Sequence, residues 1–576
     1  MLQGLRGDEY SRKAELNYTR QVPDPAMRGV IFSREGILLA ENKPSYEIVY
    51  NSLGHPRSVR RESISAFSEI FQIDKDEIIE RIRNTPRESS GDVPIFRGLE
   101  FADVVPVAER QLELSGVFQV RSTPRRHYPY GKYTSHLIGY LGEVSQEELD
   151  SDDYSDFKMG DLLGRSGIEK SYQYFLKGRD GVKSIQVFAN GIMKEDMKEG
   201  TRSVPGNNLY TTLNLELQIA STEALSASCG AVAVMDPGNG DVLALVSSPG
   251  YDINIFGRKV DAEVYSNLVN DASHPFTNRA FSEYPPGSIL KPAVSFGALE
   301  KGVIDAHTTF FCNGRFHLHG HEWKCWRLKY GGHGKISVVN AIKGSCDVYF
   351  YELGKRLGMQ GMAEIYDAFG LGQTTGIDLP NEKPGLIPHI QKGRRGGWFY
   401  RIPKAGWKQW FDGDTINASI GQGDILVTPI QMAVMTSAVA NKGTVWKPRL
   451  VSRITNSKGL NRKELQPEPA HPIIKGTSDN WNLIHEAMWE TVNQRYGTGY
   501  DARIPGLDIC GKTGSAQSGP GLTHAWFICF APRDNPEIAV AVVVEQSGHG
   551  GDIAAPIAKK ILEVYFKQVT DALGTS

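Results

Sequence analysis

The stretch "YPPGSILKP", from Tyr284 to Pro292, decides how the rest of the chain is interpreted. It places Ser288 three residues before Lys291, directly after a Pro-Pro-Gly turn. If a helix begins at this turn, the two side chains lie on one helical face, about 5–6 Å apart. A serine becomes a strong nucleophile when a neighbouring base takes its proton, and a lysine can be that base once it is neutral. The simpler interpretation is that Ser288 caps an ordinary helix.

A Ser-x-x-Lys pattern is weak evidence alone, because the chain has a second copy, Ser155 and Lys158, in an acidic segment where no function is expected. Two further motifs follow Ser288 in the chain. "KGSCDVYFY" places the polar triplet 345–347 in an apolar stretch, and "CGKTGSAQ" places Lys-Thr-Gly-Ser at 512–515 at the start of a β-rich region. These three motifs, in this order, are the signature of serine acyl-transfer enzymes that react with penicillin. Ser288 is therefore predicted to be a nucleophile.

The composition sets outer limits on function. The chain has 576 residues, enough for two or more domains, with 40% hydrophobic and 23% charged residues, as in soluble globular proteins. Its 64 basic and 66 acidic residues give a net charge of −2, so no nucleic-acid partner is indicated. No apolar run is long enough to cross a bilayer, and the polar start lacks the pattern of a signal peptide.

Two regions differ in texture, which predicts two domains, 1–206 and 207–576. The first is rich in charge and turns, and "SVPGNN" (203–208) resembles a linker. The second contains a hairpin at 230–249, two further strands at 525–532 and 537–546, and an amphipathic helix at 555–569. We therefore expect an α+β fold, with an antiparallel sheet covered by helices in the second domain.

Further segments complete a resemblance to one family. They are "MRGVIFSREGILLAENKPSYEIV" (27–49), "YPYGKYTSHLIGYLGEV" (128–144), "GRSGIEKSYQYFLKGRDG" (164–181) and "INASIGQGDILVTPIQMA" (416–433). With the three catalytic motifs, they make nearly the whole chain resemble the class B penicillin-binding proteins. Ser33 and Glu35 depart from the family pattern, where Asp and Asn are commoner. Tyr-Pro-Pro-Gly before Ser288, and Asp347 in the second motif, favour the elongation type over the division type.

The resemblance implies a penicillin-binding, serine β-lactamase-like transpeptidase domain on an elongated N-terminal pedestal domain of the dimerisation type. It implies a peptidoglycan D,D-transpeptidase in which Ser288 attacks a D-Ala carbonyl of a stem peptide and an amine from a second stem resolves the acyl-enzyme. Lys291 is expected to be the base, Ser345 to relay protons, Lys512 to supply positive charge that keeps Lys291 neutral, and Asp347 to orient the network. No cofactor is needed for this chemistry.

The Lys-Thr-Gly-Ser segment is expected to bind the substrate. On a strand, alternate side chains share a face, so Thr513 and Ser515, on either side of Gly514, can both reach the terminal carboxylate of the substrate. The backbone N–H groups of Ser288 and Ser515 would form the oxyanion hole. The alternative is a plain strand with no such role. No glutamate that could activate a deacylating water is identifiable, so β-lactams should be lasting inhibitors.

A cluster of cysteines and histidines precedes the second motif. Three of the six cysteines fall within 35 residues, together with His317, His319, His321 and His333. Thiolate and imidazole ligands are typical of structural zinc, and we expect a site made of Cys312, Cys325, His333 and Cys346. The resemblance supports His333 and Cys346, because some elongation transpeptidases have metal ligands there. A Cys312–Cys325 disulfide and free thiols are the alternatives, and the other three histidines should face solvent.

Other functions remain open at this point: a division-type transpeptidase, a D,D-carboxypeptidase or β-lactamase, or a β-lactam sensor or idle scaffold. The large N-terminal region argues against the hydrolases, and the intact motifs argue against a scaffold. The resemblance implies stem peptides, β-lactams, a SEDS-type glycosyltransferase and rod-complex proteins as partners. It also implies a single transmembrane helix, removed before Leu2, that anchors the protein in the inner membrane with its catalytic domain in the periplasm.

Overall fold

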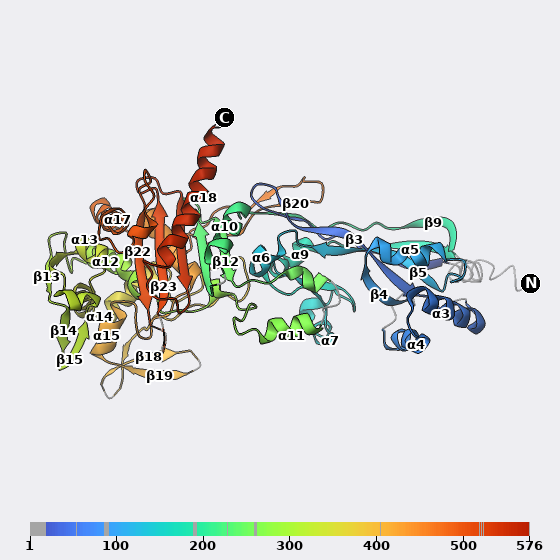
Figure 1. Cartoon of the computed structure of the whole chain (residues 1–576), viewed down its shortest axis with the longest axis horizontal. Coiled ribbons are helices and arrows are strands. Elements are labelled where there is room, and N and C mark those ends of the chain that lie inside the picture. The colour runs from blue at the N-terminus through green and yellow to red at the C-terminus, as the bar shows by residue number, and fades with distance from the viewer. Residues whose placement is uncertain are drawn as a thin grey trace, which may run out of the picture.

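The computed structural model describes residues 19–574 apart from 53–54, 86–91, 188–192, 227, 258–261, 395, 404, 518, 520 and 522. The molecule is elongated, with a large sheet and its helices at one end and the N-terminal region extending away from it (Figure 1). The segment expected to follow a membrane anchor, 2–10, lies outside the described residues. None of the described helices is both long and apolar enough to cross a membrane.

A five-stranded sheet forms the centre of the C-terminal region, in the order β12-β11-β24-β23-β22, with all neighbours antiparallel. Its strands are β11 (Gly230–Met235), β12 (Val242–Ser248), β22 (Cys510–Ala516), β23 (His524–Ala531) and β24 (Ile538–Val544). Both expected strand pairs, β11–β12 and β23–β24, form. The chain order differs from the spatial order because β11, the first strand, pairs with β24, the last. The predicted α+β class is confirmed.

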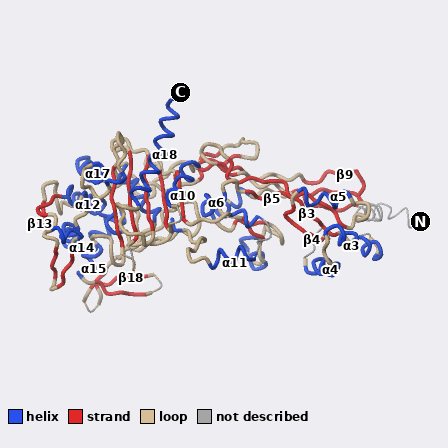
Figure 2. Tube along the Cα trace, viewed as in Figure 1, coloured by secondary structure: helices blue, strands red, loops and turns tan. Residues whose placement is uncertain are grey.

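Helices cover both faces of this sheet (Figure 2). Side chains alternate along a strand, so β11 contributes to the cores on both faces of the sheet. Val232 and Val234 belong to the core on the first face, and Ala231 and Ala233 belong to the core on the second face. The first face is covered by α10 (Leu215–Leu225) and α18 (Ala554–Gly574). The second core holds α12 (Lys291–Glu300), α13 (Val338–Lys343), α14 (Asp347–Ala368), α16 (Pro429–Ala440) and α17 (Ser478–Asn493).

The N-terminal region is built from long strands that run along the molecule's long axis (Figure 2). They include β1 (Thr19–Asp24), β3 (Leu38–Tyr50), β5 (Phe118–His127), β8 (Gly181–Val187) and β9 (Met193–Thr201), and the region also contains the shorter strands β2 (Ile31–Phe32) and β4 (Val93–Leu99). Near its far end, α3 (Arg57–Phe71), α4 (Lys75–Asn84) and α5 (Phe101–Glu109) pack on β3, β4 and β5 around Phe67 and Phe118. The rings of these two residues stack with centroids 4.2 Å apart. This apolar core defines a separate head at the end of the region.

Residues of the three N-terminal motifs, and Arg126 just outside them, converge on one buried carboxylate; the Tyr128 hydroxyl of the second motif lies 3.4 Å from it. Glu169, at 0% exposure in α8 (Gly167–Ser171), accepts hydrogen bonds of 2.7 Å from Nε of Arg28 and of Arg126. Burial alone would raise the pKa of Glu169, but the two guanidinium groups outweigh it and hold the pKa below its ordinary value. A buried charge is tolerated only when it is paired in this way. The paired side chains therefore hold these segments of the N-terminal region together.

The two regions share one sheet. Strand β10 (Asn208–Thr211) pairs in parallel with β2 and antiparallel with β20 (Val451–Thr455). Nearby, the Tyr172 hydroxyl donates to Oδ2 of Asp378 at 2.7 Å, and the same carboxylate accepts the backbone N–H groups of Leu450 and Val451. The expected linker at 203–208 therefore leads directly into a strand that joins the regions, and the boundary at residue 206 stays a prediction.

Candidate active site

Ser288 lies on a short turn rather than inside the first turn of an α-helix. A 3₁₀ segment, η4 (Gly287–Leu290), carries it, and α12 begins at Lys291. Gly287 has φ +60°, and a Cβ there would lie 3.0 Å from the carbonyl oxygen of Ser515. Its N–H donates to the carbonyl of Gly421 at 2.8 Å. The position therefore needs glycine, which has no Cβ to clash at this close approach.

The other expected catalytic side chains meet around the hydroxyl of Ser345. Nζ of Lys512 donates to Oγ of Ser345 at 2.9 Å, and Nζ of Lys291 lies 3.3 Å from the same oxygen. Lys291 also contacts Oδ1 of Asp347 at 2.8 Å and the Ser345 carbonyl at 3.2 Å. Both lysines are 0% exposed. Segments far apart in sequence thus bring two amines to one hydroxyl, which can pass protons between the amines. The carboxylate contacts one of these amines.

The backbone at Ser345 is strained. It lies between α13 and α14 with φ +50°, in the left-handed region that a non-glycine residue rarely adopts. Such conformations cost about 1–3 kcal/mol and are concentrated at functional sites. Here the strain accompanies the placement of a hydroxyl between two buried amines, which the sequence motif did not reveal.

Burial lowers the pKa of Lys512 well below the ordinary lysine value, and the nearby Lys291 adds to the shift, while Asp347 opposes it. Lys512 therefore gives up its proton more readily than an exposed lysine. This direction differs from the expected division of labour, in which Lys512 supplies the positive charge and Lys291 becomes neutral. The roles of the two lysines remain predictions.

Strand β22 lies directly against the turn that carries Ser288. A Cβ at Gly514 would lie 2.9 Å from Cγ2 of Ile289 and 3.0 Å from the carbonyl of Pro286, so glycine permits this close packing. The Thr513 hydroxyl donates to Oγ1 of Thr498 at 2.8 Å. The Ser515 hydroxyl accepts the N–H of Gly550 at 3.3 Å and lies 3.4 Å from Nδ1 of His549. Thr498 and His549 were not predicted, since no local motif marks them.

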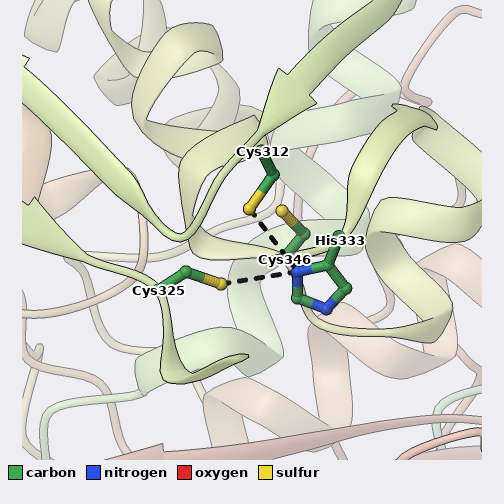
Figure 3. A group of neighbouring side chains, drawn as sticks. All are labelled: Cys312, Cys325, His333 and Cys346. Carbon is green, nitrogen blue, oxygen red and sulfur yellow. Dashed lines mark hydrogen bonds between the residues drawn. The ribbon is translucent and has the colours of Figure 1, made fainter. Parts of the chain in front are cut away.

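The four expected metal ligands come together (Figure 3). Ligand atoms of Cys312, Cys325, His333 and Cys346 all lie within 4.8 Å of one another. Nδ1 of His333 is 3.7 Å from Sγ of Cys312 and 3.5 Å from Sγ of Cys325. Atoms about 2.0–2.3 Å from a tetrahedral zinc ion are separated by about this distance. The donor set and its spacing therefore fit zinc.

The surroundings of the cluster also fit a metal. Nε2 of His333 lies 3.2 Å from the carbonyl of Gly344, which leaves Nδ1 as the ligand atom, as in many histidine metal sites. Hydrogen bonding to Cys346 lowers the pKa of Cys312 and of Cys325, toward the thiolate form that binds metals, while the same contacts raise the pKa of Cys346. All six cysteines are free thiols, so the alternative Cys312–Cys325 disulfide is not formed.

The cluster is connected to the catalytic groups through Trp326. Its backbone N–H donates to Oδ2 of Asp347 at 3.1 Å, and its indole N–H lies 3.2 Å from the carbonyl of Ser345. Trp326 directly follows Cys325, and Cys346 stands between Ser345 and Asp347. The remaining histidines of this segment (His317, His319 and His321) are exposed, as expected. The cluster thus holds the segment that carries two of the expected catalytic residues.

Two family models match the chain. The model described as the penicillin binding protein transpeptidase domain matches residues 230–563, and the penicillin-binding protein dimerisation domain matches residues 23–211. The chain therefore belongs to the class B penicillin-binding proteins, enzymes with a transpeptidase domain on a dimerisation domain.

Within this family, the chain is similar to the MrdA transpeptidases. The chain is 34% identical over 585 residues to the peptidoglycan D,D-transpeptidase MrdA of Acinetobacter baumannii, covering 98% of this chain and 84% of the relative. It is 33% identical to MrdA of Escherichia coli K12, covering 98% and 90%. Penicillin-binding protein 2 of Helicobacter pylori, solved in complex with MreC, superimposes with a TM-score of 0.81 at 25% identity, covering 95% and 99%. The predicted family, acyl-transfer activity and elongation-type function are confirmed.

Proposed function

We propose that the protein cross-links peptidoglycan stem peptides through an ester on Ser288. The Ser288 oxygen attacks the penultimate D-Ala carbonyl, the peptide bond to the terminal D-Ala breaks, and that D-Ala leaves as an amine. An amine of a second stem peptide then attacks the ester, forms the cross-linking amide and returns the oxygen to Ser288. The same hydroxyl would react with a β-lactam, whose ring amide opens to give an acyl-enzyme.

The arrangement around Ser345 is the observation that carries this proposal. A base must take the Ser288 proton, and an acid must protonate the leaving amine. Lys291, three residues after Ser288, is the proposed base. Ser345, in contact with both lysine amines at 3.3 and 2.9 Å, can relay the proton toward the leaving group, with Lys512 on its other side. Asp347 orients Lys291 through the 2.8 Å contact.

The substrate is proposed to lie between the Ser288 turn and β22. The N–H groups of Ser288 and Ser515 would stabilise the oxyanion, an effect worth about 3–4 kcal/mol for one donor in comparable enzymes. Thr513 and Ser515, with Gly514 allowing close approach, would bind the terminal carboxylate. We expect His549 to contribute to that subsite because it lies 3.4 Å from the Ser515 hydroxyl.

The test compares intact masses after incubation with benzylpenicillin. The parent chain should gain the mass of one penicillin and keep it, and Ser288→Ala should gain nothing. Ser155→Ala is the matched control, because Ser155 begins the second Ser-x-x-Lys pattern, and it should react like the parent. Penicillin that is turned over without an adduct would favour the hydrolase alternative. A Ser288→Ala variant that still forms the adduct would refute the nucleophile.

We propose that Cys312, Cys325, His333 and Cys346 hold a structural zinc ion. Zinc would supply a fixed cross-link between the cluster segments and has no step in acyl transfer. Metal content measured by mass spectrometry should be one zinc per chain, and Cys325→Ser should lose it. Cys229→Ser is the matched control and should keep its zinc. Absence of zinc from protein purified without chelators would refute the site.

We propose that the pedestal binds partners of the elongation machinery in the periplasm, on a protein anchored by one helix in the inner membrane. The solved relatives include the complex of penicillin-binding protein 2 with MreC, and a peptidoglycan synthase complex matched with a TM-score of 0.74 at 26% identity. A SEDS-type glycosyltransferase and rod-complex proteins are therefore the proposed partners. Co-purification of such proteins with the full chain, and its loss without residues 1–206, would test this.

A further inference from the structure

A pocket lies between α3 and α4 in the head of the pedestal. It has a volume of about 280 Å³. Its walls contain four cationic side chains and no acidic one: they are Arg57, Arg60, Arg61 and Lys75, together with Tyr50, Ile64, Ser65 and Ile79. The head is at the opposite end of the molecule from the catalytic sheet (Figure 1). The pocket therefore has no part in acyl transfer.

Among the residues that the structure describes, no carboxylate pairs with the positive charges of the pocket. Arg57 lies three and four residues before Arg60 and Arg61, so the three side chains share one helical face, where like charges repel. None of these three, nor Lys75, forms an ion pair with a described residue. Other arginines of the head do so: Arg81 contacts Glu77 at 2.8 Å. The pocket thus gathers positive side chains that no described carboxylate pairs with, unlike Arg81 in the same head.

Two features of α3 add to the positive potential. The helix begins after Pro56 without a side-chain cap, and its first turn contains no acidic residue, so its N-terminal dipole is unopposed. Nε of Arg60 is buried, and no described group accepts a hydrogen bond from it. Burial, followed by the charge of Arg60, lowers the pKa of the adjacent His55. A buried donor without an acceptor is costly, and a bound anion would satisfy it.

We propose that this pocket binds the phosphate group of a phosphate ester, either a lipid headgroup or a soluble ester. Guanidinium groups bind phosphate oxygens in pairs, with planar and directional hydrogen bonds. Several cations around one open pocket match a compact anionic phosphate group, and Ile64 and Ile79 offer apolar contacts to the organic part of the ester. An extended acidic peptide fits less well, because it would spread its charges beyond a cavity of this size.

The experiment measures binding of the full chain to vesicles made of phosphatidylglycerol and phosphatidylcholine in equal parts. The parent should bind these vesicles and not vesicles of phosphatidylcholine alone. Arg57→Gln/Arg60→Gln/Arg61→Gln should weaken binding on the order of 100-fold, since each basic residue near an anionic surface contributes about a factor of five. The control Lys458→Gln/Lys463→Gln/Lys475→Gln removes the same charge from exposed, unpaired lysines of the transpeptidase domain and should bind like the parent. The circular dichroism spectrum and the thermal midpoint without ligand should match the parent in both variants, which shows that the head is folded, and benzylpenicillin acylation should be unchanged.

Soluble glycerol 3-phosphate and inorganic phosphate distinguish the two sources. If glycerol 3-phosphate raises the thermal midpoint of the parent but not of the arginine variant, and vesicles do not bind, the ligand is a soluble ester. If vesicles bind and the phosphates compete, the ligand is a headgroup. If the arginine variant and the lysine variant lose vesicle binding equally, binding depends on net charge alone, and the proposal is overturned. Binding of neither probe, or of an acidic peptide alone, would overturn it as well.

Discussion

Replacing Ser345 by alanine and by glycine should separate its chemistry from its backbone strain. Both changes remove the hydroxyl that contacts Nζ of Lys512 at 2.9 Å and Nζ of Lys291 at 3.3 Å. Each lysine keeps another acceptor: Lys512 keeps the Thr513 carbonyl at 2.9 Å, and Lys291 keeps Asp347 at 2.8 Å. Both variants should therefore fold, and both should acylate slowly.

The magnitude follows from the bonds that are lost. A hydrogen bond to a charged group contributes about 1.5–3 kcal/mol, and the remaining acceptors compensate part of the loss of two such bonds, so Ser345→Ala should cost about 2–3 kcal/mol. Alanine retains the strain of φ +50°, which glycine relieves. Ser345→Gly should therefore be about 1 kcal/mol more stable than Ser345→Ala, the reverse of their usual order.

The assays are urea unfolding for stability and intact-mass time courses with benzylpenicillin for acylation. Loss of a proton relay should slow acylation by about 10²–10⁴-fold in both variants. Ser295→Ala is the control, because Ser295 is buried in α12 and its hydroxyl has no described partner, so acylation should not change. Acylation of Ser345→Ala within tenfold of the parent would refute the relay. A glycine variant less stable than the alanine variant would refute the strain.

Three further predictions concern the active site and the neighbouring Cys/His cluster. Gly287→Ala should slow acylation at least tenfold in the mass assay, because its Cβ would meet the Ser515 carbonyl at 3.0 Å and push β22 away from Ser288; an unchanged rate would contradict this packing. Burial lowers the pKa of Lys512, so between that value and the ordinary lysine value the unfolded state binds more protons and the free energy of unfolding rises with pH. Lys512→Met should flatten this rise in urea unfolding measured from pH 7 to 10, and an identical pH dependence would contradict the shift. Incubation with a zinc chelator should lower the thermal midpoint of the parent. It should not lower that of Cys325→Ser, because this variant has no complete ligand set. Equal midpoints of the parent with and without chelator would contradict a structural metal.

Local patterns were sufficient to predict much of this molecule. The hairpin at β11–β12 could be predicted because its turn and two apolar runs are adjacent in the chain. The grouping of Cys312, Cys325, His333 and Cys346 could be predicted because the thiols are concentrated in one segment and the family resemblance pointed to His333 and Cys346. Ser155 of the second Ser-x-x-Lys pattern belongs to the N-terminal region and not to the sheet that carries the Lys-Thr-Gly-Ser segment.

Other features depend on contacts that sequence patterns do not contain. Thr498 and His549 contact residues of β22 only because the fold brings distant loops beside this strand. The positive φ of Ser345 results from the junction of two helices that are packed by the whole domain. The mixed sheet across residue 206 joins strands more than 170 residues apart, Ile31 with Leu209, and a polar, proline-containing segment gave no sign of it.

The shared sheet couples the pedestal rigidly to the transpeptidase domain. Strands β2 and β10 are parallel, and both lie between the head and the catalytic sheet, so tension applied at the head would load their hydrogen bonds together, in shear. Bonds loaded together resist force better than bonds that open one after another. A force that holds or tilts the head would therefore move the transpeptidase domain with it.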